Sequence, residues 1–135
     1  MITGITFGAF DLLHAGHVHF LKASREQCDN LIVGLHSDPS FERPTKNRPI
    51  QTIFERNTQL IGCRYVNEII PYDTEADIEN MLNVYDIHVR FLGTDYVDKK
   101  CTGYDICIEE KIELIYIPRF HNYSTSELRE RIRWA

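Results

Sequence analysis

Short apolar runs alternate with segments of helical periodicity along the chain, and this alternation restricts the fold more than any other feature. The run Leu31–Leu35 is nearly all apolar, which is typical of a strand buried on both faces of a parallel sheet. Predicted strands are 2–7, 31–35, 66–70, 89–92 and 114–117, and predicted helices are 18–28, 52–63, 75–84 and 124–133. This order predicts an α/β, Rossmann-like fold: a parallel five-stranded sheet with right-handed crossovers and helices on both faces.

Length and composition favour one domain that comprises residues 1–135, because a second core does not fit in a chain of 135 residues. The formal charge of −5 argues against a nucleic-acid partner, which normally selects a basic surface. Apolar runs such as Leu31–Leu35 are far shorter than the ~20 residues that span a bilayer, so no membrane partner is expected. The start, Met1–Thr6, has neither basic residues nor a long apolar stretch, so it is not expected to be a signal peptide.

The four cysteines are far apart and contain no C-x-x-C pair, which argues against a disulfide framework and against a zinc site. We expect mostly buried, reduced thiols and therefore a cytoplasmic protein. These cysteines are Cys28, Cys63, Cys101 and Cys107.

Two histidines follow the first predicted strand, at the sheet edge where parallel α/β folds bind their ligands. His14 and His17 are three residues apart, so on a helix both imidazoles face the same object. Gly16 between them lets a large anion approach the backbone, and the helix N-terminus supplies free N–H donors. The stretch 8–17 therefore predicts an anion site; the alternative is two solvated or core histidines in a βα turn.

The stretch 8–17, G-A-F-D-L-L-H-A-G-H, resembles the H-x-G-H signature of the nucleotidylyltransferase superfamily, in its cytidylyltransferase branch. Four more stretches match in order. Lys46 with Glu55-Arg56 is similar to the family's loop lysine and E-R, Cys63–Glu68 resembles R-Y-V-D-E, Gly93–Tyr96 resembles G-D-D-W, and Arg119 with Tyr123–Leu128 resembles R-T-E-G-I-S-T-T. The resemblance covers residues 2–132 and is greatest to the glycerol-3-phosphate cytidylyltransferases.

This resemblance implies an enzyme, a nucleotidyltransferase that moves CMP from CTP to a small phosphorylated polyol, glycerol 3-phosphate above all. The products are a CDP-alcohol and pyrophosphate, Mg²⁺ is the implied cofactor, and the implied assembly is a homodimer. An adenylyltransferase that acts on a sugar phosphate or flavin mononucleotide is the alternative, since Arg48–Arg56 also resembles the R-P-V region of heptose phosphate adenylyltransferases. A non-catalytic nucleotide-binding subunit is disfavoured, because the residues implied to be catalytic are intact.

The implied catalytic residues offset the negative charge that builds on the oxygens around phosphorus; they are His14, His17, Lys46 and Arg119. The residues implied to bind the nucleotide are Gly8, Ala9, Phe10, His14, Gly16, His17, Gly93, Asp95, Arg119, Tyr123, Ser124, Thr125 and Ser126. Acceptor binding is implied for Lys46, Arg56 and Arg64, with contact to a partner subunit as the alternative for the two arginines. Contact with Mg²⁺ is expected for Asp11 or Asp95, and for Asp11 the alternative is a hydrogen bond that orients a histidine or the turn backbone. A nearby triphosphate is expected to favour charged imidazoles.

Ser124 and Glu127 have the spacing of a capping box at the start of the last helix, and such an N-terminus also binds anions. Both interpretations hold together, with the terminal phosphates on residues 124–126. Three stretches depart from the family pattern. Tyr72–Asp77 is acidic where the glycerol-3-phosphate enzymes carry lysines. Phe120–Tyr123 replaces the segment that shapes the nucleobase pocket, and residues 98–110 form a longer segment that we interpret as a lid over the acceptor.

Overall fold

The computed structural model describes residues 1–119 and 124–135. Five parallel strands form one sheet in the order β3-β2-β1-β4-β5, which confirms the predicted Rossmann-like α/β fold. The strands are β1 (Thr3–Gly8), β2 (Asn30–His36), β3 (Glu68–Tyr72), β4 (Val89–Gly93) and β5 (Glu113–Ile117). The α-helices are α1 (Ala15–Arg25), α2 (Ile53–Ile61), α3 (Glu75–Val84), α4 (Tyr104–Glu109) and α5 (Thr125–Arg133), and the 3₁₀ turns are η1 (Pro39–Phe41) and η2 (Thr94–Tyr96).

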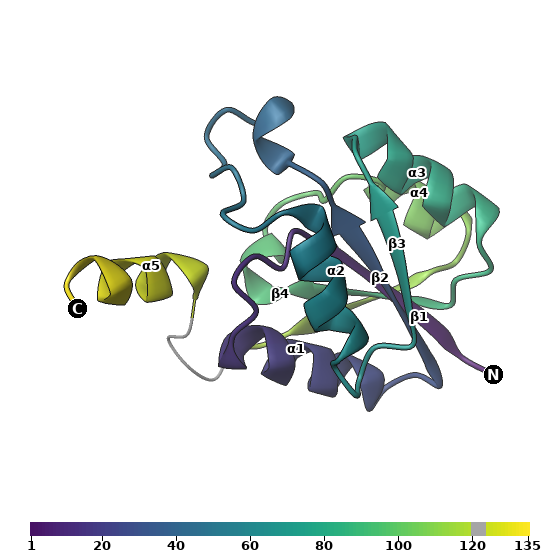
Figure 1. Ribbon diagram of the computed structural model, residues 1–135. Helices are drawn as coiled ribbons and strands as arrows, with labels where there is room; N and C mark the ends of the chain where they lie inside the picture. Colours follow the sequence, from purple (N-terminus) through teal and green to yellow (C-terminus); the bar gives the residue numbers. More distant parts are fainter. Residues whose placement is uncertain (120–123) are drawn as a thin grey trace.

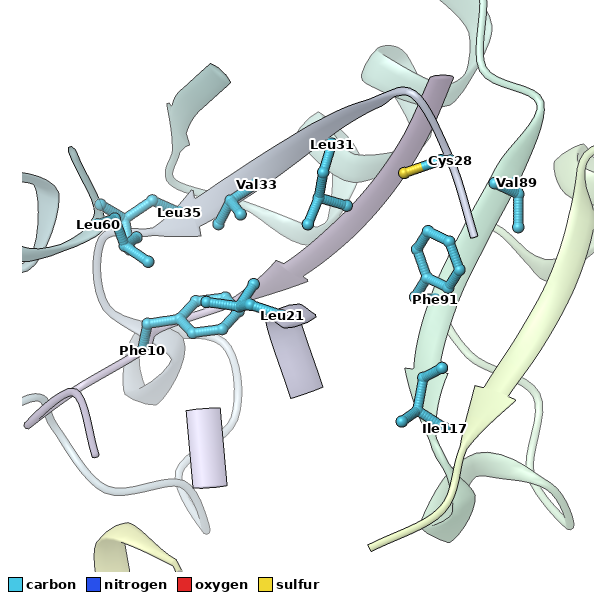
Figure 2. Packing of buried hydrophobic residues seen from close by; sticks show 10 residues of the cluster. All are labelled: Phe10, Leu21, Cys28, Leu31, Val33, Leu35, Leu60, Val89, Phe91 and Ile117. Atoms are coloured by element: carbon cyan, nitrogen blue, oxygen red, sulfur yellow. The ribbon is translucent and has the colours of Figure 1, made fainter. Parts of the chain in front are cut away.

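Helices cover both faces of the sheet (Figure 1), and the inner strand β2, which lies between β1 and β3, buries side chains on each face. Leu31, Val33 and Leu35 pack with Leu21 of α1 on one face, in the cluster that Figure 2 shows. Ile32 points to the other face, where the buried residues of α3 and α4 pack. Because successive side chains of a strand alternate between faces, a strand covered on both sides is apolar at every position. Burying each such side chain contributes about 1.5–3 kcal/mol.

Most element boundaries differ from the sequence prediction by one to three residues, and two of these differences have identifiable reasons. Strand β3 continues through Pro71, where the sequence predicted its end. The proline is tolerated because β3 lies at the edge of the sheet, where a missing N–H leaves no partner unpaired. Helix α1 starts at Ala15 and not at Val18, because His14 caps it: the Nδ1 atom of His14 accepts the Gly16 N–H at 3.0 Å.

The segment 98–110 is anchored and does not form a free lid. It contains the short helix α4, which the sequence prediction did not assign. Cys101 and Cys107 are buried, and Cys107 belongs to the core between α3, α4 and the sheet. The segment's backbone also holds a strand side chain, since the Thr102 carbonyl accepts a hydrogen bond from Arg90 of β4. The lid interpretation is therefore wrong for these residues.

All four cysteines are free, and three of them are buried. In the part of the chain that the structure describes, no helix has both the length and the apolar character that crossing a bilayer requires.

Candidate active site

A cavity of about 1030 Å³ opens at the carboxyl edge of the sheet. It lies over the point where the strand order reverses, with β2 on one side of β1 and β4 on the other. Clefts at this position are the usual ligand sites of open α/β sheets. Although the whole chain carries a net charge of −5, the described residues that line the cavity include more basic than acidic side chains. The fold thus gathers scattered positive charge around one opening.

His14 and His17 lie side by side at the N-terminus of α1, and both line the cavity. Their rings stack, with centroids 3.9 Å apart and an angle of 25° between the planes. The Nδ1 atom of His14 accepts the Gly16 N–H, and the Nδ1 atom of His17 accepts the His14 N–H at 3.3 Å. The two residues therefore form a capping box made of imidazoles. In the neutral rings this arrangement assigns the proton to Nε2, so each ring is a hydrogen-bond donor.

Burial, with the neighbouring His14 as a smaller cause, lowers the pKa of His17 to about 3, while Asp11 opposes the shift. At neutral pH the ring is therefore uncharged in the free protein. This differs from the expectation of a charged imidazole, which assumed a bound triphosphate. A neutral His17 still presents its Nε2–H as a donor, so its ability to bind an oxyanion does not depend on protonation.

Asp11 connects three segments that are far apart in the sequence. Its buried carboxylate accepts the Ile50 N–H at 2.8 Å and the Gln51 N–H at 3.0 Å, and it pairs with Arg129 of α5 at 2.9 Å. Burial acts to raise the pKa of Asp11, but the hydrogen bonds from Gln51, Ile50 and Arg129 outweigh it and hold the pKa below its usual range. Asp11 is thus an anionic anchor for the first loop, the loop before α2, and α5.

Lys46 and Arg119 both line the cavity, although they lie far apart in the sequence. Lys46 is exposed on the loop between η1 and α2, and Arg119 is exposed shortly after β5. Because both side chains are exposed and line the cavity, they can reach a ligand there. The cavity contains two donors of different shape, since an ammonium group is a point charge and a guanidinium is a planar fork.

The N-terminus of α5 borders the cavity through residues 124–126. The Ser124 hydroxyl accepts the Glu127 N–H at 3.0 Å, which is the first half of the predicted capping box. Thr125 donates its hydroxyl to the Asp11 carbonyl at 3.2 Å, so the start of α5 is fixed to the first loop. A helix N-terminus in this position adds backbone donors and a positive dipole end to the cavity.

The structure brings most of the predicted site residues together. Those that line the cavity are Gly8, Ala9, Phe10, Asp11, His14, Gly16, His17, Lys46, Gly93, Asp95, Arg119, Ser124, Thr125 and Ser126. Tyr123 and the rest of the segment 120–123, where the nucleobase pocket is expected, lie outside the described residues.

Arg56 and Arg64 do not lie where the acceptor-binding prediction expects them, since neither lines the cavity. The Arg56 side chain is 2% exposed, and its guanidinium donates to the carbonyls of Ala9, His36, Ser37 and Gln51. Its donors hold loops together and do not face a ligand, so a role in acceptor binding is wrong for Arg56. Arg64 is exposed after α2 and lies over the Tyr65 ring at 5.8 Å.

Sequence reasoning missed two arginines at the cavity. Arg129 pairs with Asp11 across 118 positions of the chain, a separation for which no local pattern exists. Arg90 gave a usable signal, because it is a charged residue inside the otherwise apolar strand Val89–Leu92. Charged residues are almost never fully buried without a partner, so a cation in such a strand indicates a functional position.

Among the described residues no cluster of three or more His, Cys, Asp or Glu side chains could hold a metal by itself. Mg²⁺ commonly binds through one or two carboxylates and completes its shell with water and substrate phosphates. Asp95 of η2 fits this requirement, since it is exposed, lines the cavity and forms no ion pair with a described residue. Asp11 fits less well, because its carboxylate oxygens already accept three hydrogen bonds.

The parallel sheet and the cavity over its switch point define an α/β protein of the Rossmann-like class with a cleft that is rich in hydrogen-bond donors. The lipopolysaccharide core biosynthesis protein from Thermoplasma volcanium GSS1 has the same fold, with a TM-score of 0.73 over 90% of this chain and 99% of that one at 24% identity. The Cytidylyltransferase-like family profile matches residues 5–131. The chain therefore belongs to the Cytidylyltransferase-like family, as the sequence motifs predict.

The chain is also similar in sequence to two curated proteins with different names. Bifunctional protein HldE of Campylobacter jejuni subsp. jejuni is 33% identical over 129 residues, which are 95% of this chain and 27% of the relative. Ethanolamine-phosphate cytidylyltransferase of Arabidopsis thaliana is 40% identical over 91 residues, which are 64% of this chain and 21% of the relative. The chain thus spans about a quarter of the length of the curated relatives it matches.

Proposed function

We propose that the protein is a nucleotidyltransferase which transfers CMP from CTP to a small phosphorylated alcohol and releases pyrophosphate. The observation that carries the proposal is the pair of stacked imidazoles at the start of α1, with their Nδ1 atoms engaged in capping, at the edge of a donor-rich cavity. Transfer at phosphorus needs little covalent chemistry from the protein. It requires donors placed where charge develops, and this arrangement supplies them.

In the proposed mechanism the acceptor phosphate attacks the α-phosphorus of CTP, and the bond to the pyrophosphate leaving group breaks. His14 and His17 donate their Nε2–H groups to phosphate oxygens. Lys46, on its exposed loop, adds a positive charge at the α-phosphate when the loop closes, and Arg119 clamps the departing phosphates with the N-terminus of α5. Asp95 would hold Mg²⁺, and the bound ion would supply further charge neutralisation at the phosphates.

The choice of CTP over ATP rests on the motifs of the chain and on its relatives. Cys63–Glu68 resembles the R-Y-V-D-E of the cytidylyltransferase branch, and the chain is similar to ethanolamine-phosphate cytidylyltransferase. Transfer of an adenylyl group to a sugar phosphate is the second candidate. It is favoured by the similarity of Arg48–Arg56 to the heptose phosphate enzymes and by the likeness to HldE over nearly the whole chain.

We propose a small phosphorylated alcohol as the acceptor, with glycerol 3-phosphate as the simplest member of the class, because the sequence motifs resemble those of the glycerol-3-phosphate cytidylyltransferases. We further propose a homodimer in the cytoplasm, as the family resemblance and the free thiols indicate.

A competition assay tests these proposals. The protein is incubated with equal CTP and ATP, Mg²⁺, and in turn glycerol 3-phosphate, ethanolamine phosphate or a heptose phosphate, and the products are resolved by mass. We expect a CDP-linked product, because a pocket that pairs with the small pyrimidine edge leaves its polar groups unpaired with a purine. A dominant ADP-linked product would reverse the choice of base. Absence of pyrophosphate release with every pair would overturn the reaction class.

A further inference from the structure

Arg90 of β4 is a buried cation without a carboxylate partner in the part of the chain that the structure describes. Its side chain is 4% exposed. One terminal nitrogen donates to the Thr102 carbonyl, the guanidinium carbon lies 4.9 Å from the centroid of the Phe7 ring, and Nε has no partner among the described residues. The ion pairs of those residues join other side chains: Arg43–Glu75, Lys100–Asp105, Arg129–Asp11 and Arg131–Glu127. Burying a guanidinium without a carboxylate partner costs free energy, because the charge loses its hydration. A bound anion would offset this cost.

Arg90 lines the same cavity as the histidines but belongs to a different part of it. Along β4, Val89 and Phe91 pack in the cluster beneath α1 and α2, so Arg90 between them points to the face covered by α3 and α4. Together with Phe7, Tyr72, Ile78 and Thr102 it forms what we call the inner arm of the cavity. The pair His14 and His17 stands at the start of α1, in the opposite helical layer.

The inner arm carries a net positive charge. Arg43 and Glu75 at its rim neutralise each other in an ion pair of 2.8 Å, and Tyr72 is buried. Burial raises the pKa of the Tyr72 hydroxyl, so this group is neutral near pH 7. Among the described residues that line the arm, Arg90 therefore has the charge that no carboxylate balances, although its guanidinium also forms a hydrogen bond with the Cys107 side chain. Its remaining N–H donors and the charge itself both favour a ligand with oxygen acceptors and a negative charge.

We propose that Arg90 determines acceptor specificity by binding an oxyanion of the acceptor, distinct from the phosphate that attacks. This inference rests on the proposed function, in which the nucleotide occupies the histidine side of the cavity and leaves the inner arm to the acceptor. The acceptor class is then a small phosphorylated alcohol with a second acidic group, a carboxylate or a second phosphate. An acceptor that ends in an ammonium group is disfavoured, because its charge would meet Arg90 in a site with little water to screen it.

A set of acceptors that differ at the far end tests the proposal on the native sequence. The set contains 3-phosphoglycerate with a carboxylate, propane-1,3-diol bisphosphate with a second phosphate, glycerol 3-phosphate with a neutral end, and ethanolamine phosphate with an ammonium group. We expect kcat/KM to fall from the acidic acceptors through the neutral one to the ammonium compound. The better of the two acidic acceptors identifies which oxyanion the arm accepts. If ethanolamine phosphate is the best of the four, the proposal is wrong.

Variants separate this specificity role from a structural one. Arg90→Gln is expected to lower kcat/KM for the acidic acceptors by about 10- to 100-fold, since a hydrogen bond to a charged group is lost. The value for ethanolamine phosphate should stay the same or rise. Arg90→Lys keeps the charge and should retain part of the preference. Arg25→Gln is the matched control, because Arg25 also donates to a backbone carbonyl, that of Cys28, but lies outside the cavity.

An equal loss for all four acceptors in Arg90→Gln would show that Arg90 acts on the fold and would overturn the proposal. If Arg90→Gln does not fold, the order of kcat/KM over the four acceptors, measured for the native protein and for Arg90→Lys, still tests the proposal. Failure of the proposed function is recognised separately, by calorimetric binding of 3-phosphoglycerate and of the bisphosphate without CTP. Binding by the native protein that weakens at least tenfold in Arg90→Lys or Arg90→Gln supports the oxyanion site even if no pyrophosphate is released. No binding of either compound, with no turnover, refutes it.

Discussion

His14 has two functions in this structure, and two substitutions separate them. Its Nδ1 atom caps α1 by accepting the Gly16 N–H, and its Nε2–H is the proposed donor to a phosphate oxygen. His14→Ala removes both functions. His14→Ser removes the ring donor but keeps a hydroxyl that can accept the same N–H, because the extended backbone at residue 14 (φ −131°, ψ 178°) suits a serine cap.

The two functions differ in magnitude. Loss of an N-cap lowers the free energy of unfolding by about 1 kcal/mol. Loss of one positioned donor to a transition-state oxygen lowers the rate by about 10²–10³-fold, equivalent to roughly 3–4 kcal/mol. We therefore expect both variants to lose turnover to a similar extent, while only His14→Ala becomes measurably less stable. Since neither effect requires a charged imidazole, the loss should persist across pH 6.5–8.

The assay measures pyrophosphate release at saturating CTP with the best acceptor, alongside urea unfolding of each variant. His88→Ser is the matched control. The Nδ1 atom of His88 also accepts a backbone N–H, that of Thr3, but His88 lies at the amino end of β4, away from the cavity. Its turnover should equal that of the native protein.

Turnover of His14→Ser within threefold of the native value would refute the donor role. So would a rate loss in His14→Ala that parallels its loss of folded protein, since capping alone would then explain it.

Lys46→Ala should lower kcat far more than it weakens calorimetric CTP binding, because the exposed loop engages fully only in the closed state; the reverse pattern would make Lys46 a binding residue only. The pKa of Asp11 is lowered on folding, so its contribution to stability is complete above about pH 4 and disappears as pH falls through the folded pKa; the difference in unfolding free energy between the native protein and Asp11→Asn should shrink from pH 7 to pH 3. Arg56→Lys should lower the free energy of unfolding by about 3 kcal/mol or more, because buried carbonyls lose their donors, while the folded fraction keeps the native acceptor KM.

Local signals in the sequence predicted most of the fold. Strand β2 follows from an unbroken apolar run, and α3 begins and ends where the prediction placed it, with Thr74 and Asp77 as its capping pair. The prediction of element boundaries failed where neighbouring strands in the sheet decide whether a residue belongs to a strand. Pro71 is compatible with a strand only because β3 is at the edge of the sheet, and that order is a tertiary property.

The sequence by itself determined the parallel α/β fold and singled out His14 and His17 after the first strand as the proposed donors, because periodicity and motif spacing are local properties. Only the tertiary structure decided which charged side chains line the cavity. Arg56 and Arg90 are both buried arginines, yet the first donates to four backbone carbonyls while the second lines the cavity and its Nε has no partner among the described residues. Asp11 binds Arg129 across 118 positions. The sequence shows which residues are charged. Which partner each charge has depends on burial and on contacts between residues that are far apart in the sequence.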